Sequence, residues 1–291
     1  MPETSTTIDG IATDRDAHAN ANPHADPQAD PQADQAAADT AASTAGETSG
    51  VRLSDDQRAQ TDDPDYATEE YDEAYFKSIV KNKAYRSFKL RMKWIDQLVQ
   101  PKAGDKIIDL GCGAGMVAEH CAEAGATVYG VDLSPVAIEC AREVNADNPS
   151  ATFVVGDASN VPGAEPASFD KAISADVTEH CGYDVMMGIF HEAMRLLKPG
   201  GTYFIYTPNP HHWIELAKEW GILKQHPAHT GLRTGPVICD ALKKAGFEIV
   251  SNPSSPSMIP GVNAAEWLWT KLPGAGTLAN YRVIVLARKP G

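Results

Sequence analysis

The first 65 residues lack aromatic side chains and hold few basic ones. No Phe, Trp or Tyr precedes Tyr66, and residues 1–65 contain 14 acidic and 3 basic side chains, so they account for −11 of the net charge of −14. A self-repelling segment without large apolar groups cannot bury enough surface to offset the entropy of ordering it. We therefore predict a disordered acidic tail over residues 1–65 and a folded domain over residues 66–291.

Other absences narrow the class of protein further. No stretch approaches the roughly 18 apolar residues that suggest a membrane span, and no basic and apolar leader opens the chain. The five cysteines include no CxxC pair, which favours reduced thiols in a cytoplasmic protein. The residues after the tail carry little net charge and no basic stripe, which argues against a nucleic-acid partner.

After the tail, helical and strand patterns alternate. Recurring apolar positions over residues 72–99 predict one or two amphipathic helices. Short apolar runs predict strands over 106–110, 126–131, 152–155, 169–174, 202–207, 247–250 and 281–287. Helical patterns lie between them over 114–124, 135–145, 184–197 and 234–245. This alternation predicts an α/β fold, a doubly wound and mostly parallel seven-stranded sheet with N-terminal helices.

Two long stretches, 208–232 and 252–280, interrupt the alternation and are expected to form lids or substrate walls. They contain four tryptophans that either cover an acceptor or close the core: Trp213, Trp220, Trp267 and Trp269. The first stretch also contains four histidines, which we interpret chiefly as solvated side chains: His211, His212, His226 and His229.

A glycine-rich turn follows the first predicted strand. The sequence runs Asp109-Leu110-Gly111-Cys112-Gly113-Ala114-Gly115 and then enters a helix. Glycines there accept positive φ and let the backbone approach a ligand, while the exposed N–H groups at the helix start favour a polar or anionic group. A purely structural turn is the alternative for the triplet taken alone.

Spacing separates this turn from the dinucleotide fingerprint. The pattern is GxGxG rather than GxGxxG, and the acid Asp109 stands two residues before it. About twenty residues later a second strand ends at Asp132, whose carboxylate suits ribose hydroxyls, and a third strand ends near Asp157. The carboxyl ends of these strands share one edge of the sheet, where open α/β sheets bind ligands. Surface carboxylates at strand ends are the alternative.

These residues resemble the S-adenosylmethionine (SAM)-dependent methyltransferases of class I over roughly residues 75–250. The resemblance implies that Gly111 and Gly113 line the methionine part of SAM, that Asp132 holds the ribose, and that Asp157 meets the adenine amino group. Leu90-Arg91, the glycine turn and Glu179-His180 more closely resemble the ubiquinone-pathway O-methyltransferases. In that group an arginine at the place of Arg91 helps to hold the SAM carboxylate; a solvated helix arginine is the alternative. The full set expected to bind SAM is Arg91, Asp109, Gly111, Cys112, Gly113, Asp132, Leu133, Asp157, Ala158 and Ala175.

The segment after the fourth strand carries Asp176, Glu179 and His180. The ubiquinone-pathway group has Glu-x-x-Glu-His at this place, which is implicated in divalent-metal binding, and Asp176 departs from that pattern by one methylene. The three residues could hold a metal such as Mg²⁺. Alternatively, His180 is a general base without a metal, or Glu179 and His180 orient the following helix. We favour the orienting role narrowly and keep His180 as the best catalytic candidate.

The sequence therefore predicts a methyltransferase that uses SAM and a small-molecule acceptor, preferentially at oxygen. N- or C-methylation is an alternative, because the SAM motifs do not define the acceptor atom. A non-enzymatic SAM- or nucleotide-binding regulatory module is a second alternative, and Asp132, Asp157 and His180 together favour an enzyme over it. An RNA methyltransferase is disfavoured by the absence of a basic stripe.

Overall fold

The computed structural model describes residues 73–81, 86–223, 231–257, 259, 261–269, 271 and 278–291. The expected tail over residues 1–65 lies outside this part of the chain. Within the described residues no helix combines the length and apolar character needed to cross a membrane.

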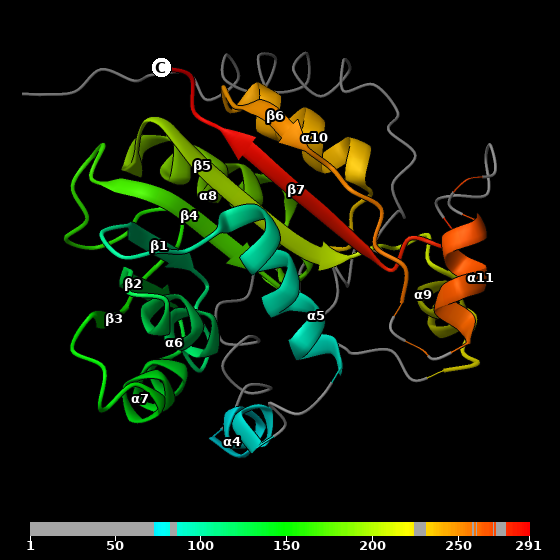
Figure 1. The fold of residues 1–291 in the computed structure, drawn as a ribbon, viewed down its shortest axis with the longest axis horizontal. Helices are drawn as coiled ribbons and strands as arrows, with labels where there is room; N and C mark the ends of the chain where they lie inside the picture. Colours follow the sequence, from blue (N-terminus) through cyan, green and yellow to red (C-terminus); the bar gives the residue numbers. More distant parts are fainter. Residues whose placement is uncertain are drawn as a thin grey trace, which may run out of the picture. The chain divides into compact units, whose positions relative to one another are not determined.

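A seven-stranded sheet organises the fold, in the order β3-β2-β1-β4-β5-β7-β6 (Figure 1). The strands are β1 (Lys106–Leu110), β2 (Thr127–Asp132), β3 (Ala151–Val155), β4 (Phe169–Ala175), β5 (Leu197–Pro208), β6 (Glu248–Ser251) and β7 (Arg282–Arg288). Neighbouring strands are parallel except for β7, which runs antiparallel to both β5 and β6. The predicted doubly wound, mostly parallel sheet is confirmed.

Helices cover both faces of this sheet. The helices are α4 (Glu73–Lys81), α5 (Arg86–Trp94), α6 (Met116–Glu123), α7 (Pro135–Val144), α8 (Tyr183–Leu196), α9 (Trp213–Glu219), α10 (Gly235–Lys244) and α11 (Val262–Trp269). A π-helical turn over Ile95–Val99 continues α5, and a 3₁₀ turn over Thr178–His180 follows β4. The sequence pattern over 72–99 thus forms two helices, one of the two expected arrangements.

Strand residues alternate between two apolar cores, as period-2 geometry requires. Ile108 and Tyr203 pack with α8 and α10 on one face. Their neighbours Ile107 and Phe204 pack with α5, α6 and α7 on the other. Because both faces are buried, the central strands are almost continuously apolar, as the sequence indicated.

Most element boundaries lie within two residues of those expected, but β5 begins five residues earlier. It pairs Leu197 with Phe169, and the register shifts before Thr202 pairs with Lys171. Gly200 adopts φ +78° in this segment. A glycine-containing irregularity therefore extends the strand through a stretch whose Pro-Gly-Gly sequence is typical of a turn.

The chain leaves β1 toward β2 and β3 on one side and later returns to β4 and β5 on the other. The carboxyl ends of β1 and β4 consequently meet at a topological switch point, the usual ligand position in open α/β sheets. The two long insertions contain α9 and α11, which lie beside each other at one end of the sheet (Figure 1).

Candidate functional site

The glycine turn is held closely between its neighbours. The backbone N–H groups of Gly111 and Cys112 both donate to the carbonyl of Val131, each at 2.9 Å. Gly111 has φ +80°, and a Cβ atom placed on it would lie 2.5 Å from Cγ2 of Val177. A side chain at this position would therefore meet both backbone strain and a steric clash.

Asp132 ties the glycine turn to the end of β2. One carboxylate oxygen accepts from the N–H of Gly113 at 2.8 Å, and the other accepts from the N–H of Ser134 at 3.0 Å. Burial raises the pKa of Asp132, while these two N–H donors act in the opposite direction. Each oxygen keeps a further lone pair, so the carboxylate retains capacity for ligand hydroxyls.

A cavity of about 450 Å³ opens beside the turn at the carboxyl ends of β1 and β4. The residues that line it are Tyr75, Phe76, Ile79, Ser87, Phe88, Arg91, Asp109, Gly111, Cys112, Gly113, Ala114, Met116, Val117, Ala175, Asp176, Glu179, His180 and Arg282. The aromatic and aliphatic members come chiefly from α4 and α5, whereas the charged members come from α5, β1, β7 and the segment after β4. The cavity thus has an apolar wall and a charged wall.

Nine of the residues predicted from sequence meet at this cavity: Arg91, Asp109, Gly111, Cys112, Gly113, Ala175, Asp176, Glu179 and His180. The other four lie at the ends of β2 and β3 and do not line it. Leu133 and Asp157 are exposed there and Ala158 is buried. Asp157 accepts the N–H of Ser159 at 2.7 Å. The two strand ends remain neighbours, since Asp132 pairs in register with Val155.

Asp109 is a buried carboxyl group on the cavity wall. Burial raises its pKa to about 7, the Asp132 charge adds to this effect, and the Arg91 charge opposes it. Its Oδ2 atom has no hydrogen-bond partner in the described part of the chain. An acceptor buried without a donor is unfavourable, so this oxygen suits a cationic or N–H group of a bound ligand.

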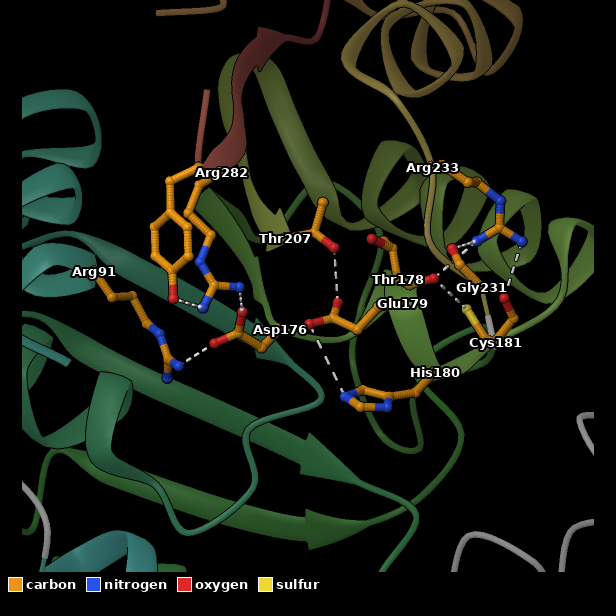
Figure 2. A network of polar contacts seen from close by, with 11 residues as sticks. Arg91, Asp176, Thr178, Glu179, His180, Cys181, Thr207, Gly231, Arg233 and Arg282 are labelled. Carbon is orange, nitrogen blue, oxygen red and sulfur yellow. Dashed lines mark hydrogen bonds and ion pairs between the residues drawn. The ribbon is translucent and has the colours of Figure 1, made fainter. Parts of the chain in front are cut away.

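Two arginines converge on Asp176 at the end of β4 (Figure 2). Arg91 contacts Oδ2, and Nη1 of Arg282 donates to Oδ1 at 3.1 Å. Burial acts to raise the pKa of Asp176, but the charges of Arg91 and Arg282 outweigh it and hold the pKa below its ordinary value. The two guanidinium groups also lie near the ring of Tyr206, 5.8 and 5.1 Å from its centroid.

Backbone geometry helps to place this carboxylate. Asp176 has φ +57°, a left-handed conformation that is uncommon for residues other than glycine. Its N–H donates to the carbonyl of Tyr206 on β5 at 2.7 Å. The β4 strand therefore ends in a sharp bend that directs the chain toward the 3₁₀ turn bearing Glu179 and His180.

Glu179 is almost fully buried beside His180. The hydroxyl of Thr207 donates to its Oε2 at 2.8 Å, and its Oε1 lies 4.0 Å from Nε2 of His180 (Figure 2). Burial raises the pKa of Glu179 to about 8, and the adjacent negative charge of Asp176 adds to the shift. His180 is partly exposed to the cavity and is the residue of this turn best placed to exchange a proton with a bound molecule.

The predicted metal site does not fit this geometry. Both oxygens of Asp176 are held by arginines, whose positive charge opposes a second cation at the same carboxylate. Across the described ranges no group of three His, Cys, Asp or Glu side chains is arranged to hold a metal. We therefore withdraw the role of Asp176, Glu179 and His180 as joint metal ligands. His226 and His229 lie outside the described residues.

Arg282 is the site residue that sequence reasoning missed. It begins strand β7, whose interior residues are apolar, and its partly buried side chain lies against Asp176 and Tyr281. The sequence contained one signal for Arg282, because a charged residue at the start of a buried strand needs an opposite charge nearby. Its partner lies 106 positions away in the sequence, so the pairing itself was beyond local patterns. The aromatic wall from Tyr75, Phe76 and Phe88 was also not singled out.

Comparisons with known proteins show which family the chain belongs to. Residues 108–205 match a family model described as a methyltransferase domain. A ubiquinone biosynthesis O-methyltransferase from Thiobacillus denitrificans is 36% identical over 121 residues, covering 41% of this chain and 51% of that protein. An uncharacterised methyltransferase from Synechocystis sp. is 32% identical over 151 residues, covering 50% of this chain and 68% of that protein. This chain belongs to the class I SAM-dependent methyltransferases.

Two more distant similarities cover longer segments of the chain. A 24-methylenesterol C-methyltransferase from rice, Oryza sativa subsp. japonica, is 28% identical over 209 residues, covering 67% of this chain and 53% of that protein. A Haloferax volcanii protein described as a putative methyltransferase, solved in complex with the Trm112 methyltransferase activator, shares the fold with a TM-score of 0.59 at 19% identity, covering 75% of this chain and 97% of that one. The chain spans about half the length of the first ubiquinone-pathway relatives that it matches.

The residues of this methyltransferase fit SAM chemically. Gly111 leaves no room for a side chain at the turn, Asp109 presents an unpartnered carboxyl oxygen beside it, and Asp132 closes the same turn from β2. A ligand that joins methionine to a nucleoside requires three features of its site. These are a glycine turn that lets it approach the backbone, an acceptor for its ammonium group and an acceptor for its ribose diol. Arg91 lines the same cavity but already contacts Asp176, so any role with the SAM carboxylate would be shared with that ion pair.

Proposed function

We propose that this chain transfers a methyl group from SAM to an oxygen atom of a small-molecule acceptor. One observation carries the proposal: the glycine turn and the Glu179–His180 pair line the same cavity. A donor seated on the turn would therefore face a side chain able to remove a proton from an acceptor. The ubiquinone-pathway relatives support oxygen as the acceptor atom.

We assign the donor contacts by position. Gly111, Cys112, Gly113 and Ala175 border the methionine part of SAM, and the carboxylate of Asp109 accepts from its ammonium group. Asp132 and Leu133 meet the ribose, whereas Asp157 and Ala158 meet the adenine. The order of these residues along adjoining strand ends supports the assignment, because an extended nucleoside can cross from β1 to β3.

Bound SAM supplies an electrophilic methyl group, and the chain supplies orientation and proton transfer. His180 accepts the proton of the acceptor hydroxyl through a ring nitrogen. Glu179 lies 4.0 Å away and balances the resulting imidazolium charge when it is ionised. Arg91 and Arg282 hold Asp176 at the cavity wall, and the apolar wall from α4 and α5 limits water. No step requires a metal, since the carboxylate that would have held it is occupied by arginines.

The cavity supports a small and partly apolar acceptor. Its volume of about 450 Å³ lies within the range of small-molecule pockets. The aromatic wall formed by Tyr75, Phe76 and Phe88 suits a planar or hydrocarbon group, while the charged wall lies beside the reacting atoms. This division favours an acceptor with an apolar body and one polar end.

C-methylation is the second candidate, and the match with a sterol C-methyltransferase favours it. A carbon acceptor also requires removal of a proton, which His180 would perform in the same position. SAM binding without catalysis is a weaker candidate, because it makes no use of a base beside the donor. N-methylation also releases a proton from the acceptor amine, so the base alone does not distinguish it from O-methylation. Transfer of ¹³C-labelled methyl from SAM, followed by NMR of the product, distinguishes methyl groups on oxygen, nitrogen and carbon.

A substrate screen tests the proposal directly. The full chain is incubated with SAM and a panel of small phenols, alcohols, amines and enols, and release of S-adenosylhomocysteine is measured with and without EDTA. We expect release with a hydroxylated acceptor and no effect of EDTA. Binding of SAM without turnover across the panel would instead support a SAM-binding module.

We further propose a reducing compartment, the cytoplasm, as the setting. All five cysteines lie in the described part of the chain and none is paired in a disulfide. Cys112, Cys121, Cys140 and Cys239 are buried, and burial raises the pKa of the Cys121 and Cys239 thiols. Unpaired, unreactive thiols are typical of cytoplasmic proteins.

A further inference from the structure

The 3₁₀ turn that carries Glu179 and His180 is held by residues outside it. Within the turn, the N–H of His180 donates to the carbonyl of Val177 at 3.0 Å. A turn of three residues has too few internal hydrogen bonds to fix its own position. The place of His180 at the cavity therefore depends on what the rest of the turn's backbone contacts.

Arg233, which follows the first insertion, bridges the two ends of this turn (Figure 2). Its Nη1 donates to the carbonyl of Thr178 at 2.8 Å, and its Nη2 donates to the carbonyl of Cys181 at 2.9 Å. The two acceptors stand on either side of the Glu179–His180 pair in the sequence. One planar guanidinium group, with its donors in a fixed arrangement, thus spans the turn.

Gly231 brings the segment of Arg233 directly against the same turn. Its N–H donates to the carbonyl of Glu179 at 2.7 Å, and its own carbonyl accepts from Nη1 of Arg233 at 2.7 Å. A Cβ atom on Gly231 would overlap the carbonyl oxygen of Cys181 and lie 2.9 Å from that of Thr178. Because a side chain would prevent this approach, the contact between the two segments requires glycine here as well as arginine two residues later.

The charge of Arg233 is costly at this place. Among the described residues its guanidinium group contacts carbonyls and lies 6.0 Å from the ring centroid of Tyr183, with no carboxylate beside it. Burial lowers the pKa of Arg233. The group also lies at the start of α8, where the helix dipole disfavours a positive charge. Folding stability alone therefore gives a weak reason for an arginine here, whereas its hydrogen bonds to the turn give a specific one.

We propose that Arg233 is a positioning residue that sets the place of His180 relative to the methyl donor. This inference rests on the proposed methyl transfer, which gives the turn a task that needs accurate placement. Arg233 is not among the described residues that line the cavity, so it acts through the backbone of the turn and touches neither donor nor acceptor. A displacement of about 1 Å at a reacting group can lower a rate by about 10²-fold. Loss of these hydrogen bonds should therefore act on turnover.

NMR of the imidazole groups tests the placement without an acceptor. The full chain, labelled with ¹³C at histidine, is measured free and after addition of S-adenosylhomocysteine, and His180→Ala assigns the signal of His180. We expect Arg233→Gln to shift or split this signal, and Gly231→Ala to do the same from the backbone side of the contact. An unchanged His180 signal in folded Arg233→Gln would overturn the proposal.

Lys289→Gln is the matched control for loss of a cation that holds backbone carbonyls. Nζ of Lys289 donates to the carbonyls of Met194 and Leu197 at the far end of α8, each at 2.7 Å. Its loss should lower the melting temperature, as Arg233→Gln does, but leave the His180 signal in place. Equal displacement of that signal in both variants would reduce Arg233 to a general effect on α8 and overturn the proposal.

Steady-state kinetics with an acceptor from the substrate screen tests the effect on turnover. Arg233→Gln should lower kcat by about 10–10²-fold and change SAM affinity and the acceptor KM little, because the donor and acceptor contacts remain. Arg233→Lys should recover only part of kcat, since one ammonium nitrogen replaces two donor nitrogens. An unchanged kcat in Arg233→Gln would overturn the proposal. Absence of methyl transfer by the wild type with every acceptor, together with a displaced His180 signal in Arg233→Gln, would contradict the proposed function and confirm that Arg233 places the turn.

Discussion

At the scale of single residues, the wall of the cavity combines two carboxyl groups with raised pKa values, Asp109 and Glu179, and one that is held ionised, Asp176. Burial acts on Asp109, Asp176 and Glu179 in the same direction, but Asp176 alone has two contacting guanidinium groups. Asp176 therefore differs from Asp109 and Glu179 in the charges around it and not in its burial. It stays ionised, whereas the other two carboxyl groups titrate near neutral pH.

The raised pKa of Glu179 predicts a stability that falls as pH rises. Its pKa is about 8 in the folded chain and 4.5 ordinarily, so between these values the folded state holds a proton that the unfolded state has lost. The free energy of unfolding should decrease across that window. Between pH 5 and pH 8, the free energy of unfolding should decrease by about 3 kcal/mol less in Glu179→Gln than in the wild type, as measured by urea denaturation. The exposed Glu248→Gln should leave the slope unchanged; an unchanged slope in Glu179→Gln as well would contradict the shift.

His180 carries the prediction for proton transfer. Once an acceptor is known, His180→Ala should lower kcat by about 10²–10⁴-fold and leave SAM affinity intact, because a general base acts in the transition state and not on the donor. Steady-state kinetics and calorimetry measure the two effects separately. Full activity would remove His180 from the chemistry, and a loss of SAM affinity or stability with unchanged kcat would assign it the orienting role.

At the scale of elements, the glycine turn depends on space as well as on backbone freedom. Gly111 and Gly104 both have positive φ, but only the added Cβ at Gly111 meets a neighbour, Cγ2 of Val177 at 2.5 Å. Gly104→Ala should therefore lower stability by about 1 kcal/mol. Gly111→Ala should lower it further and also weaken SAM binding, as measured by thermal melting and calorimetry. Equal effects of the two substitutions would show that the contact with Val177 is unimportant.

Elements governed by local pattern could be predicted from sequence. The apolar run that forms β1, the glycine turn and the carboxylates after β2 and β3 all lie where periodicity and spacing placed them. The Arg91–Asp176–Arg282 cluster could not be predicted, because it joins three elements through contacts between residues 85 and 106 positions apart. The motif also could not show that Asp176 is neutralised by arginines from other elements, which is the observation that disfavours the metal interpretation. The burial of Glu266 on α11 likewise depends on its contacts with His212 and Trp213 at the start of α9, which are distant in the sequence.

At the scale of the whole molecule, we predict that the acidic tail is dispensable for folding and donor binding. Residues 1–65 account for −11 of the net charge and contain no aromatic residue, so they have little to contribute to a packed core. Deletion of residues 1–60 should leave the melting temperature and the SAM affinity nearly unchanged. A large decrease in either quantity would show that the tail packs on the folded part.

The central claim is that the edge of the sheet at β1, β2 and β3 binds SAM and not a dinucleotide. Calorimetric titration of the full chain with SAM, S-adenosylhomocysteine and NAD tests it most directly, with Asp132→Ala beside the wild type. We predict saturable binding of SAM and S-adenosylhomocysteine, no binding of NAD, and a loss of about 1–3 kcal/mol of SAM binding free energy in Asp132→Ala, the usual effect of removing a buried hydrogen-bond partner. Binding of NAD without binding of SAM would contradict the account.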